Sequence, residues 1–238
     1  MPVVDTSSNT IAFVRRTTNI YGNRDPRELP AYPVTEAAHY IDVPVSTLRA
    51  WIGGQRGFRR IINVPTVSDG QLSFYNLVEA FVVNGLRRKH GIPLQKLRRA
   101  VESLKSLAPD SKHPLAELDL QTFARDLFLD SRGKLVNVSR GGQLAISEVL
   151  RPVLERVEKD VSGVARLYPL TRPEPGSSPK VIVIDPRIQF GRPVIAGTGI
   201  PTSVIRERWK AGDSVSALAE DYDRKIEEIE EALRYEAA

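Results

Sequence analysis

The sequence predicts a mainly helical α+β protein with small β elements, and three observations lead to this class. Apolar residues recur at helical spacing over residues 75–107 and 144–160. Short β-branched runs bounded by turn residues occur at only a few places. A stretch dense in proline, glycine and serine, residues 171–179, is typical of a linker and indicates more than one domain.

The chain divides into five expected segments. Its 238 residues are enough for two or three small domains, each with its own core. The polar N-terminal arm is mostly irregular, with a short strand expected at Ile11–Val14. The segments are the arm (1–30), a head (31–113), a mixed α/β middle segment (114–170), the linker (171–179) and a C-terminal helical domain (180–238).

Residues 34–52 of the head are expected to form two short helices joined by a turn. Thr35 can cap the first helix, and Asp42 tolerates the left-handed conformation that such a turn requires. Pro44 suits the first position of the second helix. Leu48 with Trp51 or Ile52 then faces inward, which leaves a small polar face outward: Ser46, Thr47, Arg49 and Ala50.

The rest of the head combines a hairpin with two longer helices. Ile61–Val64 and Gln71–Phe74 flank a proline and a Ser-Asp-Gly turn, a pattern typical of a β-hairpin. Apolar spacing predicts helices at about residues 75–89 and 93–107.

The middle and C-terminal segments alternate strands and helices. Strands are expected at 123–129, 135–138, 164–170 and 181–184. A helical turn is expected at 115–120, and a helix at 144–160 with a kink at Pro152. Ser214 and Asp213 are natural caps, and the C-terminal helices are expected near 202–211, 214–221 and 225–235.

Charge is distributed unevenly along the chain. Residues 1–113 contain 16 Lys and Arg against 9 Asp and Glu, a net of +7, although the whole chain carries only +5. Residues 43–68 and 80–101 contain basic residues and no acidic ones. Such clustering favours a polyanionic partner, and the alternative is an ordinary solvated surface.

The small polar face of the second helix could enter a DNA major groove. We therefore expect Ser46, Thr47 and Arg49 to contact DNA there. The arginines of the following loop, Arg56, Arg59 and Arg60, would meet phosphates and position the protein. The alternative is a pair of helices that docks on protein and makes no DNA contact.

The stretch Ser46-Thr47-Leu48-Arg49-Ala50-Trp51 resembles the recognition helix of MerR-type regulators. Phe74–Ala80 continues the pattern that follows the wing in such proteins, and Asp42 stands where that family usually has glycine. The resemblance implies a winged helix-turn-helix head that binds operator DNA.

The C-terminal region resembles a small bacterial domain family that was long without a known function. The resemblance rests on Ile184–Ile188, Gly191–Ile195 and Gly197-Thr198-Gly199-Ile200-Pro201, where Gly199 replaces a common arginine. Members are antitoxins of PIN-like toxins, and from about Tyr21 onward the chain resembles VapBC-type antitoxins with a MerR-like head. This implies a homodimer, a PIN-like ribonuclease toxin as partner and an operator-binding role.

A PIN-like toxin holds its metal ion with clustered carboxylates, which an arginine can pair with. The candidate toxin-binding residues are Arg187, Arg192, Arg206, Arg208 and, as an apolar anchor, Trp209. The competing interpretation makes the arginines surface charges that balance the acidic last helix, and Trp209 a core residue.

Several classes of function are disfavoured by composition. The chain has no cysteine and only three scattered histidines, so we expect no metal site and no cofactor. No apolar run approaches a membrane span, and the N-terminus is unlike a signal peptide, so a cytoplasmic protein is expected. Neither glycine-rich stretch has the Gly-Lys-Thr of a phosphate loop, and no nucleophile stands out, so we expect no enzyme activity.

Two alternatives to an antitoxin remain open from the sequence: a MerR-like regulator that senses a ligand or partner through its C-terminal domain, and a protein-docking module. The apolar faces of Leu144–Val157 or of Val82–Leu104 are candidate dimer interfaces, with packing inside the monomer as the competing explanation.

Overall fold

The structure, a computed structural model, describes residues 21–22, 24–54, 59–64, 70–90, 93–107, 109–117 and 151–237. This part is about half helical and contains three two-stranded antiparallel sheets, which confirms the α+β class. The strands expected at 11–14, 123–129 and 135–138 lie outside the described residues, as do residues 144–150 of the helix expected at 144–160. No helix in the described ranges is long and apolar enough to cross a membrane.

The head contains the helices that the sequence predicts. They are α1 (Val34–Tyr40), α2 (Val45–Gly53), α3 (Phe74–His90) and α4 (Leu94–Leu107). Two details differ from expectation. Pro33 is the residue before α1, so Thr35 lies inside the first turn and makes no cap. Pro44 is the residue before α2 and accepts backbone hydrogen bonds from Thr47 and Leu48.

The prediction of a hairpin between Ile61–Val64 and Gln71–Phe74 is wrong, because the two segments do not pair. Strand β2 (Gln71–Leu72) pairs instead with β1 (Tyr32–Pro33), which precedes α1. Ile61 and Ile62 donate backbone hydrogen bonds to the carbonyl of Trp51 at 2.8 and 3.1 Å, so this run folds back on the end of α2. A short apolar run fits a buried loop as well as a strand, and here tertiary packing decides.

The apolar faces of α3 and α4 are used inside the monomer. Val82, Leu86, Leu97 and Leu104 are buried in the same core as Trp51. Packing in the monomer, rather than a dimer interface, therefore explains the face that runs from Val82 to Leu104.

The middle segment ends in a hairpin where the sequence suggested helix. After the short α5 (Pro114–Glu117), the described chain resumes with helical residues 151–154. The helix expected to reach Asp160 stops there, and Val157–Asp160 forms β3, paired with β4 (Gly163–Leu167). Val157 continues the helical spacing in sequence, but the tight turn at Gly163, with φ +112°, favours a hairpin.

The C-terminal domain has the expected order of a strand followed by three helices, and a second strand, β6, forms where the sequence predicted only a loop. Strands β5 (Ile182–Val183) and β6 (Val194–Ile195) pair, with a 3-10 turn, η2 (Gln189–Gly191), between them. Ser214 caps α9 by accepting a hydrogen bond from the Ala217 amide at 3.1 Å, as predicted. The helices are α8 (Thr202–Lys210), α9 (Val215–Asp221) and α10 (Ile226–Glu236).

The expected linker, residues 171–179, makes extensive contacts. Thr171 and Arg172 both donate hydrogen bonds to the buried carboxylate of Glu231 on α10, and the two Arg172 bonds measure 3.1 and 2.8 Å. The buried Arg156 donates to the carbonyls of Pro175, Pro179 and Ser178. This segment is therefore packed against the parts that it connects.

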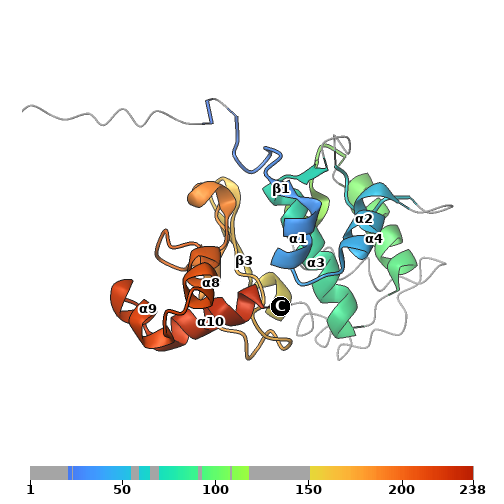
Figure 1. The fold of residues 1–238 in the computed structure, drawn as a ribbon. Coiled ribbons are helices and arrows are strands. Elements are labelled where there is room, and N and C mark those ends of the chain that lie inside the picture. Colours follow the sequence, from blue (N-terminus) through green and yellow to red (C-terminus); the bar gives the residue numbers. More distant parts are fainter. Residues whose placement is uncertain are drawn as a thin grey trace, which may run out of the picture.

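The C-terminal domain lies against the head. Figure 1 shows α8–α10 on one side, the head helices on the other and the β3–β4 hairpin between them, with the end of α10 pointing toward the head. There the Tyr235 hydroxyl donates to the Tyr40 carbonyl at 3.2 Å, and Tyr40 packs against both hydrophobic cores. Ile184 of the C-terminal domain belongs to the core of the head. These contacts make the two parts one connected structure.

Candidate functional site

Helices α1 and α2 are joined by a tight left-handed turn. Asp42 adopts the left-handed conformation that the sequence predicted, with φ 49°, and the Val43 amide donates to the Ala38 carbonyl at 2.9 Å. Asn84 of α3 supports the turn by donating to the Ile41 carbonyl at 2.7 Å. Arg88 of α3 pairs with the Asp42 carboxylate. Contacts from α3 therefore hold the turn in place.

Helix α2 buries the residues expected to face the core and leaves those expected to face outward at least partly exposed. Leu48, Trp51 and Ile52 are buried, whereas Ser46 and Arg49 are exposed. Thr47 and Ala50 are half-buried. The structure thus places the three candidate α2 contacts on the accessible side of a helix, as groove reading requires.

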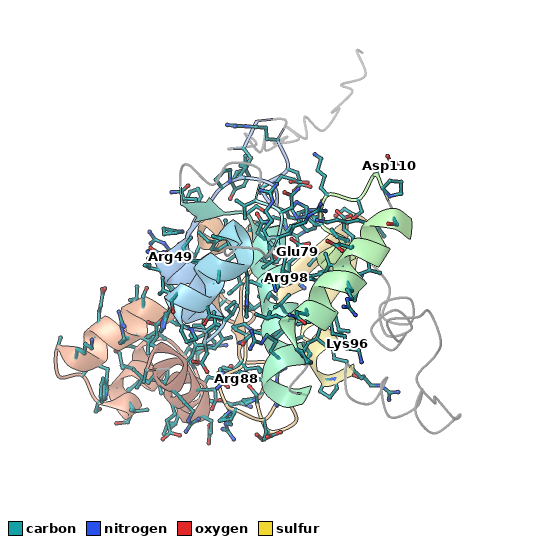
Figure 2. All side chains as sticks on the ribbon, turned by 90° about the vertical axis from the view of Figure 1, so that its right-hand side faces the viewer. Arg49, Glu79, Arg88, Lys96, Arg98 and Asp110 are labelled. Carbon is teal, nitrogen blue, oxygen red and sulfur yellow. The ribbon has the colours of Figure 1, made fainter. Side chains whose placement is uncertain are left out.

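The loop arginines lie next to α4. Arg59 has an 89% exposed side chain, and its backbone carbonyl accepts a hydrogen bond from Arg98 Nε at 2.9 Å. Arg60 is exposed and donates to the Val64 carbonyl at 3.3 Å, and Arg56 lies outside the described residues. Figure 2 looks onto this side of the head, with Arg49 on α2 and Lys96 and Arg98 on α4. Basic side chains from two helices and one loop therefore gather on one side of the head.

The C-terminal domain repeats this arrangement of two helices and a left-handed turn in α9 and α10. Helices α9 and α1 each contain seven residues, and α10 and α2 follow them after equal intervals. The Arg224 amide donates to the Ala219 carbonyl at 2.9 Å, and Asp223 has φ 50°, which repeats the turn at Asp42. The signal was present in the sequence as Ala-x-x-x-Asp, at Ala38–Asp42 and Ala219–Asp223.

The two helix pairs, α1–α2 and α9–α10, differ in charge. Where α2 carries Ser46, Thr47 and Arg49, the equivalent positions of α10 carry glutamates. Two of these, Glu227 and Glu230, are exposed. Carboxylates repel DNA phosphates, so only the head unit has the charge for a polyanion.

Three of the candidate toxin-binding arginines are engaged within the chain. Arg187 makes two hydrogen bonds of 3.0 Å to the buried Asp185 carboxylate. Arg206 lies 3.4 Å from the buried carboxylate of Glu236. Arg208 pairs with the carboxylates of Asp213 and Asp221 at 2.7 and 2.6 Å, and hydrogen bonds to these carboxylates raise its pKa.

The other two candidates are accessible. Arg192 is exposed, and its side chain forms no ion pair or hydrogen bond with any described residue. Trp209 is 50% exposed, so it is not a core residue.

A buried charged cluster supports the head beneath these surfaces. His113 Nδ1 lies 3.4 Å from the Glu79 carboxylate, its Nε2 lies 3.2 Å from that of Glu28, and its ring stacks on Tyr75 at 4.8 Å. Burial lowers the pKa of His113, but its bonds to Glu79 and Glu28 outweigh this and raise it. Burial also raises the pKa of Glu79. This cluster could not be predicted from the sequence, because its members are far apart along the chain.

Comparisons with known proteins give one match to the C-terminal domain alone and others to most of the chain. Residues 182–235 match the family model described as "Protein of unknown function (DUF433)". The chain is 29% identical over 233 residues to a Mycobacterium tuberculosis protein named "Putative antitoxin VapB45", covering 87% of this chain and 93% of the relative. It is 25% identical over 223 residues to "Uncharacterized protein Rv2308" of the same organism, covering 86% and 89%.

A solved structure shares this architecture. The crystal structure of Rv2018 from Mycobacterium tuberculosis matches with a TM-score of 0.65 and 26% identity, over 86% of this chain and 98% of that one. The chain is thus similar over most of its length to an antitoxin-named protein and to a solved structure, and its C-terminal domain matches DUF433.

Proposed function

We propose that this chain is the antitoxin of a type II toxin–antitoxin system. It neutralises a PIN-like endoribonuclease by direct binding, represses its own operon through the head, and acts without catalysis of its own. The observation that supports the DNA-binding part is the exposed face of α2 with Arg49, beside the exposed Arg59 and Arg60 of the following loop. The toxin partner is supported by similarity to the antitoxin-named relative.

The head accounts for operator binding in this proposal. Ser46, Thr47 and Arg49 read bases in the major groove, and Arg59 and Arg60, together with Arg56, contact DNA phosphates from the loop that follows α2. Operators of such proteins are usually palindromic, so the chain binds as a homodimer. The acidic α10 keeps the α9–α10 helix pair away from DNA.

A ligand-sensing regulator of the MerR type is the competing function. The structure contains a pocket of about 230 Å³, lined by Arg49, Val64, Gln71 and neighbouring residues. Small-molecule sites usually have volumes of about 300–1,000 Å³. This pocket is smaller, and it lies in the head instead of the C-terminal domain that would sense the ligand.

Replacing Arg49 tests the DNA-binding part of the proposal. Arg49→Ala is expected to weaken binding to the region upstream of the gene by about 1–3 kcal/mol, because a base contact is lost. Arg59→Ala and Arg60→Ala should give smaller losses that do not depend on sequence. Fluorescence anisotropy at two salt concentrations measures both effects.

The α9–α10 helix pair provides a matched control. Glu230 occupies on α10 the position that Arg49 occupies on α2, and it is equally exposed. Glu230→Ala should leave DNA affinity unchanged or slightly raise it, because one repulsive charge is removed. Equal affinities for wild type, Arg49→Ala, Arg59→Ala and Arg60→Ala would show that the head does not bind DNA.

A further inference from the structure

We infer that the turn formed by residues 189–192 is the surface by which this chain binds its acidic ribonuclease partner, an inference that rests on the proposed function. Within this turn Phe190 is 68% exposed and Arg192 is exposed with no side-chain partner among the described residues. An exposed aromatic ring and an unpaired guanidinium, two residues apart, are the kind of side chains that dominate protein interfaces.

The turn holds its aromatic residue in an unfavourable backbone conformation. Gln189, Phe190 and Gly191 have φ values of 48°, 56° and 80°, three consecutive residues in the left-handed region. Glycine adopts this region freely, but phenylalanine does so at a cost. A phenylalanine that is both strained and exposed contributes little to the stability of the fold, so its presence calls for another role.

Surrounding contacts fix the turn in place. The Gly191 amide donates to the Ile188 carbonyl at 2.9 Å, and the Arg192 amide donates to the Gln189 carbonyl at 3.1 Å. Next to it, the buried Asp185 accepts hydrogen bonds from the Arg187 backbone and side chain at 2.9–3.0 Å. A turn that is already ordered loses little conformational entropy when it binds.

The same region touches both the N-terminal arm and the head. The Tyr21 hydroxyl donates to the Pro186 carbonyl at 2.8 Å, and its ring lies edge-on to Phe190 at 6.4 Å. Gly191 lies so close to the buried Tyr32 hydroxyl that a side chain at this position would overlap it. The Phe190 ring is therefore supported at one edge and remains open to a partner.

The chemistry of the turn indicates the kind of partner surface. Arg192 fits a carboxylate, which it can bind through two parallel hydrogen bonds. Phe190 fits an apolar recess beside that carboxylate. The metal-binding carboxylates of a PIN-like ribonuclease supply the acidic part of such a surface. Arg187, Arg206 and Arg208 are less suitable, since each would first have to leave an internal carboxylate.

The test is a titration of the full-length chain against the purified PIN-like ribonuclease encoded next to its gene. Phe190→Asn and Arg192→Gln are each expected to weaken binding by about 10-fold or more, as for interface anchors. Asparagine tolerates the left-handed region, so Phe190→Asn should keep or raise the melting temperature while affinity falls. A phenylalanine with a merely structural role would show the opposite pattern, a lower melting temperature and unchanged affinity.

A second variant adds charge at the same surface. Gly199 is exposed, its φ is not positive, and a Cβ there would meet Gln189 Nε2 at an ordinary 3.7 Å. Gly199→Arg is therefore expected to fold normally and to strengthen binding several-fold, most clearly at low salt. Val161→Ser, at the fully exposed tip of the β3–β4 hairpin, is the control and should bind like wild type.

The outcomes separate this inference from the proposed function. If the wild type binds the ribonuclease and the Phe190 and Arg192 variants bind equally well, the turn is not the contact surface but the antitoxin proposal stands. If the wild type does not bind, the antitoxin proposal fails and this inference fails with it. Loss of affinity in both variants with normal melting temperatures supports the turn as the anchor.

Discussion

Gly191→Ala is expected to destabilise the protein by about 2–5 kcal/mol, the sum of a left-handed alanine and a steric overlap. Gly191 has φ +80°, and a methyl group there would overlap the Tyr32 hydroxyl and lie 2.9 Å from Tyr32 Cζ. This contact joins the C-terminal domain to the head, so the loss should appear in the unfolding of the whole chain. For a protein of this size it corresponds to a fall in melting temperature of about 5–15 °C in a thermal denaturation scan.

Two variants control this prediction. Gly176→Ala in the same half of the chain has open space around its Cβ, so its melting temperature should stay near that of wild type. Tyr32→Phe removes a buried hydroxyl that has no hydrogen-bond partner among the described residues. It should therefore be tolerated alone and should partly rescue Gly191→Ala. No rescue in the double variant would mean that backbone conformation, and not the contact with Tyr32, sets the cost.

Glu79→Ala is expected to cost about 3–5 kcal/mol of unfolding free energy, because it leaves a buried His113 without its main partner. Both side chains are 2% exposed, so solvent cannot replace the lost contact. Urea denaturation measures the effect. Glu102→Ala removes an exposed pair with Arg59 at 3.9 Å and should change stability by no more than about 0.5–1 kcal/mol.

The same cluster makes stability depend on pH. His113 and Glu79 both have raised pKa values, so the folded state binds their protons more tightly than the unfolded state. The His113 contribution is therefore fully present below its unfolded pKa of about 6.5 and is lost as pH rises through the folded value. His113→Gln should reduce the loss of unfolding free energy as the pH rises. A wild-type stability that rises between about pH 6 and 8 would contradict the arrangement.

Three carboxylates outside this cluster determine how stability falls at low pH. Burial would raise the pKa values of Asp185, Glu231 and Glu236, but all three values are lowered. Hydrogen bonds from Arg187 and Arg172 outweigh burial at Asp185 and Glu231, and the nearby imidazole of His39 with a hydrogen bond from Thr202 does so at Glu236. Their contribution is present above the unfolded pKa of about 4 and is lost as pH falls through the folded values. The chain should thus be most stable in weakly acidic solution.

Local patterns in the sequence were enough to predict the helices and the turns. The left-handed turn at Asp42, the buried face of α2 and the cap at Ser214 all follow from residue type and spacing over a few positions. The same is true of α3 and α4, whose periodic apolar residues define their cores. The exposed position of Arg49 could be predicted for this reason.

Features that depend on distant contacts could not be predicted in this way. β2 pairs with β1 instead of Ile61–Val64, and Val157–Asp160 leaves the helical pattern to form a hairpin. Residues 171–179 have a linker-like composition but bind Glu231, 60 residues from Thr171. The availability of Arg192, in contrast to Arg187 and Arg208, likewise depends on which carboxylates the fold brings near each guanidinium.

The most direct test of the proposed function measures RNA cleavage by the PIN-like ribonuclease encoded beside this gene while the full-length chain is added. The account predicts that cleavage falls to background at a stoichiometric ratio, because the antitoxin occupies the carboxylate-lined site. Cleavage that persists at a large molar excess of the chain, or a neighbouring gene that encodes no such ribonuclease, would contradict it.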